Sequence, residues 1–504
     1  MIISGPDTIV QAEKLGRVHF VGIGGAGMSG IARIMAARGI TVSGSDAKDS
    51  TVLAALRALG ATCWVGHEAE HVAQVDTVVV STAIRETNPE VVAARAAGIP
   101  ILPRAAALAS VMVGRRTIAV AGTHGKTTTT SMLTVALQHC GADPSYAIGG
   151  NLNESGSNAH DGTGDLFVAE ADESDKSFLT YTPEVSIVTS VEPDHLDNYG
   201  DEASYAAAFD AFCDRVIPGG FMVICVDDAG ARRLAGFARN RGIDVHTYGE
   251  SDDADTRVTE ITATGATQSF VPVVRGRKLP AVGLQQAGKH NALNASAALT
   301  VGLGLGFSAS DLAEGLAAFT GTGRRFEFKG MEDGVRVFDS YAHHPTELAV
   351  DLTAARQVAG EGRRVIACFQ PHLFSRTRIF ATRFSEALAL ADEVVVMDVF
   401  AAREDPEPGI TGALIANHVP LKPEQVRFEP SWSAVPRTVA DLAVPGDLVV
   451  TLGAGDVTLI GPEVVGLLAE RAAASSAVDA EVVDPEGVDP EGVDPATVPS
   501  SAAE

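Results

Sequence analysis

The stretch TIAVAGTHGKTTTT, residues 117–130, constrains the fold of this chain more than any other. Thr117–Val120 is apolar and β-branched, which predicts a short buried strand. A glycine-rich turn with Lys126-Thr127 follows it, and Ser131–Cys140 has helical character. This order is that of a phosphate-binding loop, in which backbone N–H groups and a helix N-terminus meet phosphate oxygens. Val120 stands where the common pattern has its first glycine, so the loop is a shortened form, G-x-x-G-K-T-T.

The residue types in this loop indicate a nucleotide triphosphate as ligand. Lys126 can reach the β- and γ-phosphates, and the Thr127 hydroxyl can ligate Mg²⁺. An ordinary glycine turn with an exposed lysine is the alternative interpretation. We expect ATP contacts from the whole loop: Gly122, Thr123, His124, Gly125, Lys126, Thr127 and Thr128.

A second glycine-rich turn lies near the N-terminus. Val18–Ile23 predicts a strand, Met28–Arg38 a helix, and Thr41–Ser45 a second strand that leads into Asp46. The pattern resembles a dinucleotide fingerprint, whose fold holds NAD, FAD or a nucleotide-sugar diphosphate. Tight packing of strand on helix without a ligand is the alternative. The predicted ligand contacts are Gly22, Gly24, Gly25, Gly27, Asp46, His67, Ser81 and Thr82.

Acidic clusters follow two more predicted strands. Asp165–Ala169 leads into EADESD at 170–175, and Val185–Thr189 leads into EPDHLD at 192–197. If both strands lie parallel to Thr117–Val120, their carboxyl ends meet at the phosphates. One Mg²⁺ could then be held by Thr127 and Glu170, and a second could bridge Glu170 and His195. A solvated acidic loop is the alternative.

Farther along, Asn291 and Asn294 are three residues apart and share a helical face. Carboxamides at this spacing can grip an adenine or ribose, although Asn291 could instead be an N-cap. Strand, polar loop and helix then alternate from about Phe326 to the end of the ordered chain, which predicts another parallel α/β domain.

Composition limits the class of protein. A net charge of −26 argues against binding to nucleic acid or to an anionic membrane surface. The five cysteines are scattered and lack a C-x-x-C, which favours a reducing cytoplasm. We find no leader and no apolar run long enough to insert into a membrane. From residue 475 the chain is acidic and contains VDPEG repeats, so we expect a disordered tail.

Nine motifs in fixed order resemble the Mur ligases of peptidoglycan synthesis. They are GIGGAGM at 22–28, GTHGKTTT at 122–129, EADESD at 170–175, EPDHLD at 192–197, HNALNA at 290–295, GRRF at 323–326, YAHHPTE at 341–347, FQPHLFSRTR at 369–378 and AAREDP at 401–406. The similarity is greatest to the members that join L-alanine to UDP-N-acetylmuramate. Two departures stand in the seventh motif region, where Ser340 and Ala342 replace residues common in the family.

The resemblance implies a three-domain α/β protein. It implies a Rossmann-like UDP-sugar domain at 1–114, a central P-loop ATPase domain with a mostly parallel sheet at 115–323, a Rossmann-like amino-acid-binding domain at 324–474 and the tail at 475–504. It also implies that ATP and Mg²⁺ are needed and that the enzyme is a cytoplasmic monomer or weak dimer.

The resemblance further implies the reaction and its residues. ATP would phosphorylate the lactyl carboxylate of UDP-N-acetylmuramate, and the amine of L-alanine would attack the acyl phosphate. The implied catalytic residues are Lys126, Glu170, His195 and Arg324, with Asn291, Asn294 and Arg324 on ATP. The implied amino-acid contacts are Tyr341, His343, His344, Arg376 and Arg378.

Three alternatives remain open at this point. A dehydrogenase would explain the N-terminal glycines but not the phosphate loop. A P-loop switch protein would explain Lys126 but not the N-terminal fold. A related ligase that adds a preformed peptide to the same sugar would share the N-terminal glycine loop.

Overall fold

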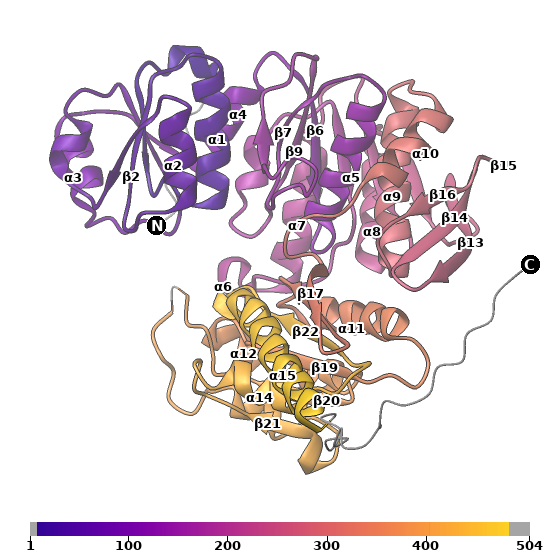
Figure 1. Cartoon of the computed structure of the whole chain (residues 1–504). Helices are drawn as coiled ribbons and strands as arrows, with labels where there is room; N and C mark the ends of the chain where they lie inside the picture. Colours follow the sequence, from indigo (N-terminus) through magenta and orange to yellow (C-terminus); the bar gives the residue numbers. More distant parts are fainter. Residues whose placement is uncertain (1–7, 403, 483–504) are drawn as a thin grey trace, which may run out of the picture.

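Three β-sheets organise the chain in sequence order, and helices cover each of them (Figure 1). The computed structural model describes residues 8–402 and 404–482. Its sheets have five, eleven and six strands from the N-terminus onward. The strands of the sheet interiors are apolar and buried on both faces, as parallel sheets between helices require. The predicted three-domain α/β architecture is therefore confirmed.

The N-terminal sheet is parallel, in the order β3-β2-β1-β4-β5. Its elements are η1 (Ala12–Lys14), β1 (Val18–Val21), α1 (Ala26–Ala37), β2 (Val42–Asp46), α2 (Thr51–Ala58), β3 (Thr62–Val65), η2 (Ala69–Val72), β4 (Thr77–Val80), α3 (Pro89–Ala96), β5 (Ile101–Pro103) and α4 (Arg104–Met112). The strand order reverses between β1 and β4, where Val21 pairs with Val80. Doubly wound sheets bind ligands at such a reversal, beyond the carboxyl ends of the strands.

The central sheet has a parallel core and an antiparallel extension. Its elements are β6 (Arg116–Ala121), α5 (Lys126–His139), β7 (Ser145–Ala147), β8 (Ala159–His160), β9 (Leu166–Glu170), η3 (Ser177–Thr180), β10 (Val185–Val188), α6 (Leu196–Tyr199), α7 (Glu202–Cys213), β11 (Phe221–Cys225), α8 (Ala229–Asn240), β12 (Asp244–Gly249), β13 (Thr256–Thr264), β14 (Thr267–Val274), β15 (Arg277–Lys278), β16 (Val282–Leu284), α9 (Lys289–Gly304) and α10 (Ala309–Ala318). Strand β6 lies between β9 and β10 and is parallel to both. The carboxyl ends of these three strands therefore meet, as the sequence predicts.

Helix α5 begins earlier than the sequence pattern indicates. It starts at Lys126, directly after the glycine turn, although the helical pattern is evident only from Ser131. Threonines are weak helix formers, but Thr130 and Thr134 donate their hydroxyls to the carbonyls of Lys126 and Thr130, each at 2.8 Å. The phosphate loop therefore ends directly on a helix N-terminus.

The C-terminal sheet has the order β17-β18-β22-β19-β20-β21, and β17 is its antiparallel edge. Its elements are β17 (Glu327–Glu332), β18 (Val335–Ser340), α11 (Pro345–Ala359), β19 (Val365–Phe369), α12 (Phe374–Leu388), β20 (Glu393–Val396), α13 (Ala413–Ala416), η4 (Pro423–Gln425), β21 (Val426–Phe428), α14 (Val435–Leu442), β22 (Leu448–Leu452), η5 (Asp456–Leu459) and α15 (Ile460–Val482). Helix α15 continues past residue 475, where the sequence places the start of the tail. The remainder of that predicted tail, residues 483–504, lies outside the described residues.

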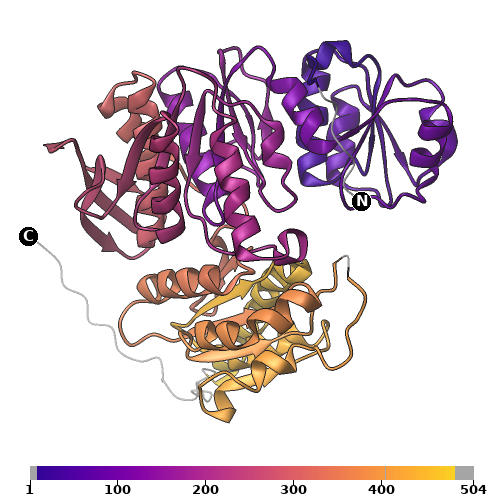
Figure 2. The ribbon, with the colours of Figure 1, turned by 180° about the vertical axis from the view of Figure 1, so that it is seen from behind.

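The central domain contacts both of its neighbours (Figures 1 and 2). On the N-terminal side, Arg38 pairs with Asp161 at 2.8 Å, and the Asn158 amide donates to the carbonyl of Ala26 at 2.7 Å. The C-terminal domain lies against the carboxyl edge of the central sheet, below it in Figure 1. Among the described helices we find none that is both long and apolar enough to cross a membrane.

A buried carboxylate organises the polar interior of the N-terminal domain. The Glu90 side chain on α3 is fully buried, and its oxygens lie 2.7 Å from His71 Nδ1 and 3.2 Å from His67 Nδ1. It also accepts a hydrogen bond from Ser45. Burial raises the pKa of Glu90, but the nearby His19, at 3.6 Å, and the hydrogen bonds with Ser45 and His71 outweigh it and lower the pKa to about 2. Glu90 is therefore a charged group that its partners hold in the core.

We predict that Glu90→Gln lowers the stability of this domain by about 3 kcal/mol at pH 7, because it breaks a buried charged network. Because the pKa of Glu90 is lowered in the folded state, its charge stabilises the fold above the unfolded value near 4.5 and is lost as pH falls towards 2. Differential scanning calorimetry should therefore show that the difference in unfolding free energy between wild type and variant becomes smaller as pH falls from about 4.5 to 2. Glu86→Gln, at an exposed ion pair with Arg95, is the control. Equal losses in both variants would contradict this account.

Candidate active site

Two glycines shape the phosphate loop between β6 and α5. Gly122 has φ +129°, and a Cβ there would lie 2.1 Å from the Thr189 hydroxyl. Gly125 has φ +79° and is the N-cap of α5, and a Cβ there would lie 2.7 Å from Asn294 Oδ1. Both positions therefore need glycine for conformation and for space. The resulting turn exposes the backbone N–H groups at the start of α5.

Lys126 in this loop is paired with a buried carboxylate. Its Nζ lies 2.8 Å from Glu173 Oε2 and donates to the Gly122 carbonyl at 2.7 Å. Burial lowers the pKa of Lys126, but the charges of Glu173, Asp172 and Glu170 outweigh it and leave the pKa raised. Burial raises the pKa of Glu173 to about 7, against the opposing effect of Lys126. The lysine is therefore charged and held by one carboxylate and its own loop.

The predicted metal ligands line one cavity at the ends of β6, β9 and β10. Thr127 Oγ1 donates to Glu170 Oε1 at 3.1 Å, and Glu170 Oε2 accepts from the Gly149 backbone at 2.8 Å. Burial lowers the pKa of His195, so its ring is neutral and has a nitrogen lone pair to offer. A hydroxyl, a carboxylate and a neutral imidazole fit a divalent cation.

All three domains line this cavity, which has a volume of about 630 Å³ and is called the larger cavity below. The N-terminal domain contributes Ala26, Gly27, Gly30, Ile31, Arg104 and Leu108. The central domain contributes Lys126, Thr127, Asn158, Glu170 and His195 among others, and the C-terminal side contributes Arg324, Arg325, Tyr341, His343, His372 and Arg376. A reaction here can therefore draw on groups from every domain.

A smaller cavity of about 350 Å³ lies on the other side of the phosphate loop. Of the predicted ATP contacts, His124, Gly125, Thr128, Asn291 and Asn294 line it. Asn294 Nδ2 lies 3.5 Å from Asn291 Oδ1, so both amides share a face of α9, as their spacing predicts. The N-cap of this helix is Gly288, which rules out the capping role for Asn291. The two cavities flank one loop, with Gly125 and Arg325 in both linings.

Arginines and an aromatic ring form the C-terminal wall of the larger cavity. The guanidinium carbons of Arg324 and Arg325 lie 4.8 Å and 5.3 Å from the centre of the Tyr341 ring. Arg325 also donates to Thr127 Oγ1 at 3.0 Å, and Arg324 donates to the Gly453 carbonyl at 2.6 Å. These contacts bring the segment after the central domain onto the phosphate loop.

Two predicted amino-acid contacts, His343 and Arg376, also line the larger cavity. His343 Nδ1 donates to the Tyr341 carbonyl at 3.0 Å, and burial lowers its pKa to about 3. Its Nε2 is therefore an acceptor. Arg376 is buried and lies 3.0 Å from Asp194 in the central domain. Burial raises the pKa of Asp194, but Arg376 outweighs it and holds that pKa well below its usual range.

Two other predicted amino-acid contacts need correction. His344 is fully buried and is not among the described residues that line either cavity. It is the N-cap of α11, and its Nδ1 accepts from the Thr346 backbone at 3.4 Å. Arg378 is about half exposed and pairs with Glu407 at 3.1 Å. It lies two residues after Arg376 on α12, and that spacing places the two side chains on opposite faces of the helix.

The predicted UDP-sugar contacts lie around the carboxyl ends of β1, β2 and β4. Gly27 lines the larger cavity, and a Cβ there would lie 2.6 Å from Arg104 Nη1. Asp46 accepts from the Gly24 backbone at 3.0 Å and so braces the turn formed by Gly22, Gly24 and Gly25. His67 is turned towards Ser45 and Glu90. Ser81 and Thr82 follow β4, next to Gly22 at the strand-order reversal.

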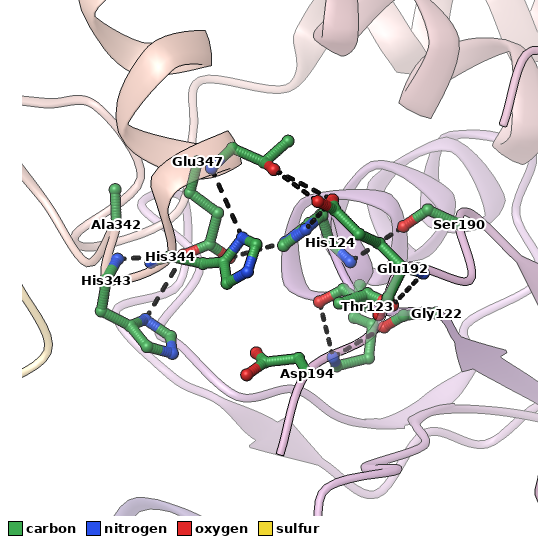
Figure 3. Close-up of polar contacts among 12 residues, drawn as sticks. Gly122, Thr123, His124, Ser190, Glu192, Asp194, Ala342, His343, His344 and Glu347 are labelled. Carbon is green, nitrogen blue, oxygen red and sulfur yellow. Dashed lines mark hydrogen bonds and ion pairs between the residues drawn. The ribbon is translucent and has the colours of Figure 1, made fainter. Parts of the chain in front are cut away.

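The sequence prediction missed several charged residues of the site. The ring of His124 does not face the loop's interior but lies between Glu192 and Glu347 (Figure 3). Glu173 and Glu192 stand inside motifs quoted for other residues, and His344-x-x-Glu347 has the spacing of a capping box. Arg325 stands in the GRRF motif beside Arg324, whereas Arg104 has no local pattern that would mark it. Their roles depend on contacts between domains.

Comparison with protein-family models finds three consecutive matches. The Mur ligase family catalytic domain matches residues 17–116, the Mur ligase middle domain matches 120–302, and the Mur ligase glutamate ligase domain matches 324–455. Together they span most of the described chain.

Similar proteins are known by sequence and by structure. A UDP-N-acetylmuramate–L-alanine ligase of Acidothermus cellulolyticus is 58% identical over 91% of this chain and 96% of its own length. The crystal structure of the UDP-N-acetylmuramate-alanine ligase of Thermotoga maritima has a TM-score of 0.76 and 29% identity over 91% of this chain and 99% of that chain. A murein peptide ligase of Psychrobacter arcticus has a TM-score of 0.67 and 25% identity over 90% of this chain and 99% of that chain. The chain belongs to the Mur ligase family.

Proposed function

We propose that this enzyme joins L-alanine to the lactyl carboxylate of UDP-N-acetylmuramate in peptidoglycan precursor synthesis, and that it converts ATP to ADP and phosphate. The observation that carries the proposal is the larger cavity, to which all three domains contribute charged or polar groups. Such a cavity suits a reaction with three substrates, each brought by its own domain. We propose the divisions 1–114, 115–323 and 324–474 for the UDP-sugar, ATP and amino acid.

ATP is proposed to lie across the phosphate loop. Lys126 and the loop backbone from Gly122 to Thr128 would bind its phosphates, and Asn291 and Asn294 would face the nucleoside in the smaller cavity. Arg324, beside Tyr341, would stabilise charge on the transferred phosphoryl group. Lys126 would exchange Glu173 for phosphate oxygens when ATP binds.

One Mg²⁺ is proposed to bind at Thr127 and Glu170, whose oxygen donors suit it, and a second divalent ion is proposed to bridge Glu170 and His195. Bound there, they would neutralise charge on the phosphates. Glu170 is oriented by the Gly149 backbone, so one oxygen is fixed while the other faces Thr127.

The chemistry we propose has two steps. The lactyl carboxylate attacks the γ-phosphorus of ATP, and ADP leaves. The alanine amine then attacks the acyl phosphate, and phosphate leaves with the oxygen that formed the P–O bond. His343 Nε2, an acceptor, would orient the alanine amine, and Arg376 would attract its carboxylate.

Two further properties belong to the proposal. The five cysteines are free thiols, which supports a reducing cytoplasm. We propose a monomer or weak dimer with no nucleic-acid partner and no membrane insertion. The second candidate function is a ligase that adds a preformed peptide to the same sugar, and the likeness to a murein peptide ligase favours keeping it.

An amino-acid panel tests the function. We expect phosphate release from ATP with UDP-N-acetylmuramate to be fastest, by kcat/KM, with L-alanine. Glycine and L-serine should react more slowly. The tripeptide L-alanyl-γ-D-glutamyl-meso-diaminopimelate, which gives a structurally similar ligase of Neisseria its name, should not react. Faster turnover with this tripeptide would overturn the proposal in favour of the second candidate.

Lys126→Ala should lower kcat by at least about 100-fold, on the order of 3 kcal/mol, because its charge meets the developing charge of the phosphoryl group. Phosphate release at saturating Mg·ATP measures this loss. Lys278→Ala, on the exposed strand β15, is the matched control and should keep wild-type turnover. Turnover of Lys126→Ala close to that of the control would contradict the assignment.

A further inference from the structure

His124 lies between two carboxylates that come from different domains (Figure 3). Its Nε2 is 3.0 Å from Glu192 Oε2, which follows β10, and its Nδ1 is 3.2 Å from Glu347 Oε1, in the first turn of α11. A neutral imidazole has one donor and one acceptor nitrogen, whereas a carboxylate only accepts. Both contacts therefore require the imidazolium form. Burial lowers the pKa of His124, but Glu192 and Glu347 outweigh it and raise the pKa to about 9.

The backbone of His124 is fixed to the central domain. Its N–H donates to the Ser190 hydroxyl at 3.1 Å, and its carbonyl accepts from the Thr189 hydroxyl. Glu192 in turn accepts from the Thr346 hydroxyl at 2.9 Å and from Arg383 at 2.8 Å, both in the C-terminal domain. The phosphate loop and the C-terminal domain thus share a compact charged network.

Glu347 links this network to the proposed amino-acid site. While Oε1 faces His124, Oε2 accepts from the backbones of His343 and His344 at 3.0 Å and 3.2 Å. That second oxygen closes the capping box at the start of α11. His343 lines the larger cavity, so one carboxylate joins the phosphate loop to a residue on the amino-acid side.

We propose that His124 is a positioning residue whose imidazolium bridges the phosphate loop to Glu347 and thereby sets the place of His343. It would act on the amino-acid site rather than bind phosphate. The kinetic test rests on the proposed function, but the bridge itself does not. Contact of the C-terminal domain with the phosphate loop and binding of the amino acid would then be coupled through the protonated ring of His124.

A metal ion is the competing interpretation of this cluster. Nitrogen and oxygen atoms of His124, Glu192 and His344 lie within 4.8 Å of one another, close enough for one divalent cation. However, His344 Nδ1 already accepts from the Thr346 backbone, which places the ring proton on Nε2. Both nitrogens of His124 also face carboxylates. The donor arrangement therefore favours a proton over a metal.

Two variants separate the two halves of the bridge. The amide of His124→Asn reaches about as far as Nδ1 and can still donate to Glu347, whereas that of His124→Gln reaches about as far as Nε2 and can donate only to Glu192. We expect His124→Gln to raise the KM for L-alanine about tenfold and His124→Asn to raise it less. The KM for ATP should stay within about twofold in both. His139→Gln, at the exposed end of α5, is the control.

Two further readouts complete the test. The backbone amides of His343 and His344 should exchange hydrogen faster in His124→Gln than in the wild type. This measurement does not depend on catalysis. Glu347→Gln should add nothing to the KM effect of His124→Gln in the double variant, because both break one bridge. If the wild type ligates no amino acid, the proposed function fails, while hydrogen exchange still decides the bridge.

Three results would overturn the proposal. The first is a KM for L-alanine within twofold of wild type in His124→Gln together with unchanged exchange at His343 and His344. The second is a raised KM for ATP alone, which would make His124 a phosphate ligand. The third is stabilisation of the wild type, but not of His124→Gln, by one equivalent of Zn²⁺, which would make the cluster a metal site.

Discussion

The parallel pairing of β6 with β9 and β10 is the constraint on which the site depends. Because three adjacent strands end at one edge, the loops after them must lie together. One loop carries Lys126, the second carries Glu170 and Glu173, and the third leads to Glu192 and His195. A basic group thus meets several acids in a space that excludes much of the solvent. The pairing of Lys126 with Glu173 compensates part of this buried charge when no ligand is bound.

Charge pairing across domains then completes the site. Arg376 and Asp194 are both buried and lie 3.0 Å apart, and the imidazolium of His124 bridges Glu192 and Glu347. Removing one partner would leave an uncompensated buried charge, which costs about 3–5 kcal/mol. These pairs therefore favour the arrangement in which the C-terminal domain lies against the phosphate loop. The N-terminal domain has a more exposed ion pair with the central domain, between Arg104 and Asp172 at 3.1 Å.

Local pattern was enough to predict β1, β4, β6, β9 and β10 and the glycine turns and polar residues that follow them, but it did not mark β11 to β16 of the central sheet. Gly122, Lys126 and Glu170 lie where their motifs predict, because each depends on neighbours in sequence. The sequence could not separate His343 from His344, since only the N-cap geometry of α11 turns the second ring into the core. The pair of Arg376 with Asp194 spans 182 positions, and no periodicity reports such a contact. Long-range packing between domains decides these residues.

The proposed acyl phosphate requires the lactyl carboxylate of the UDP-sugar and the γ-phosphate of ATP to meet in the larger cavity. Isotope transfer tests it most directly. UDP-N-acetylmuramate labelled with ¹⁸O in its lactyl carboxylate is turned over with ATP and L-alanine, and the released phosphate is analysed by mass spectrometry. An acyl phosphate predicts one ¹⁸O atom in each phosphate and one retained in the amide. Unlabelled phosphate would contradict the account.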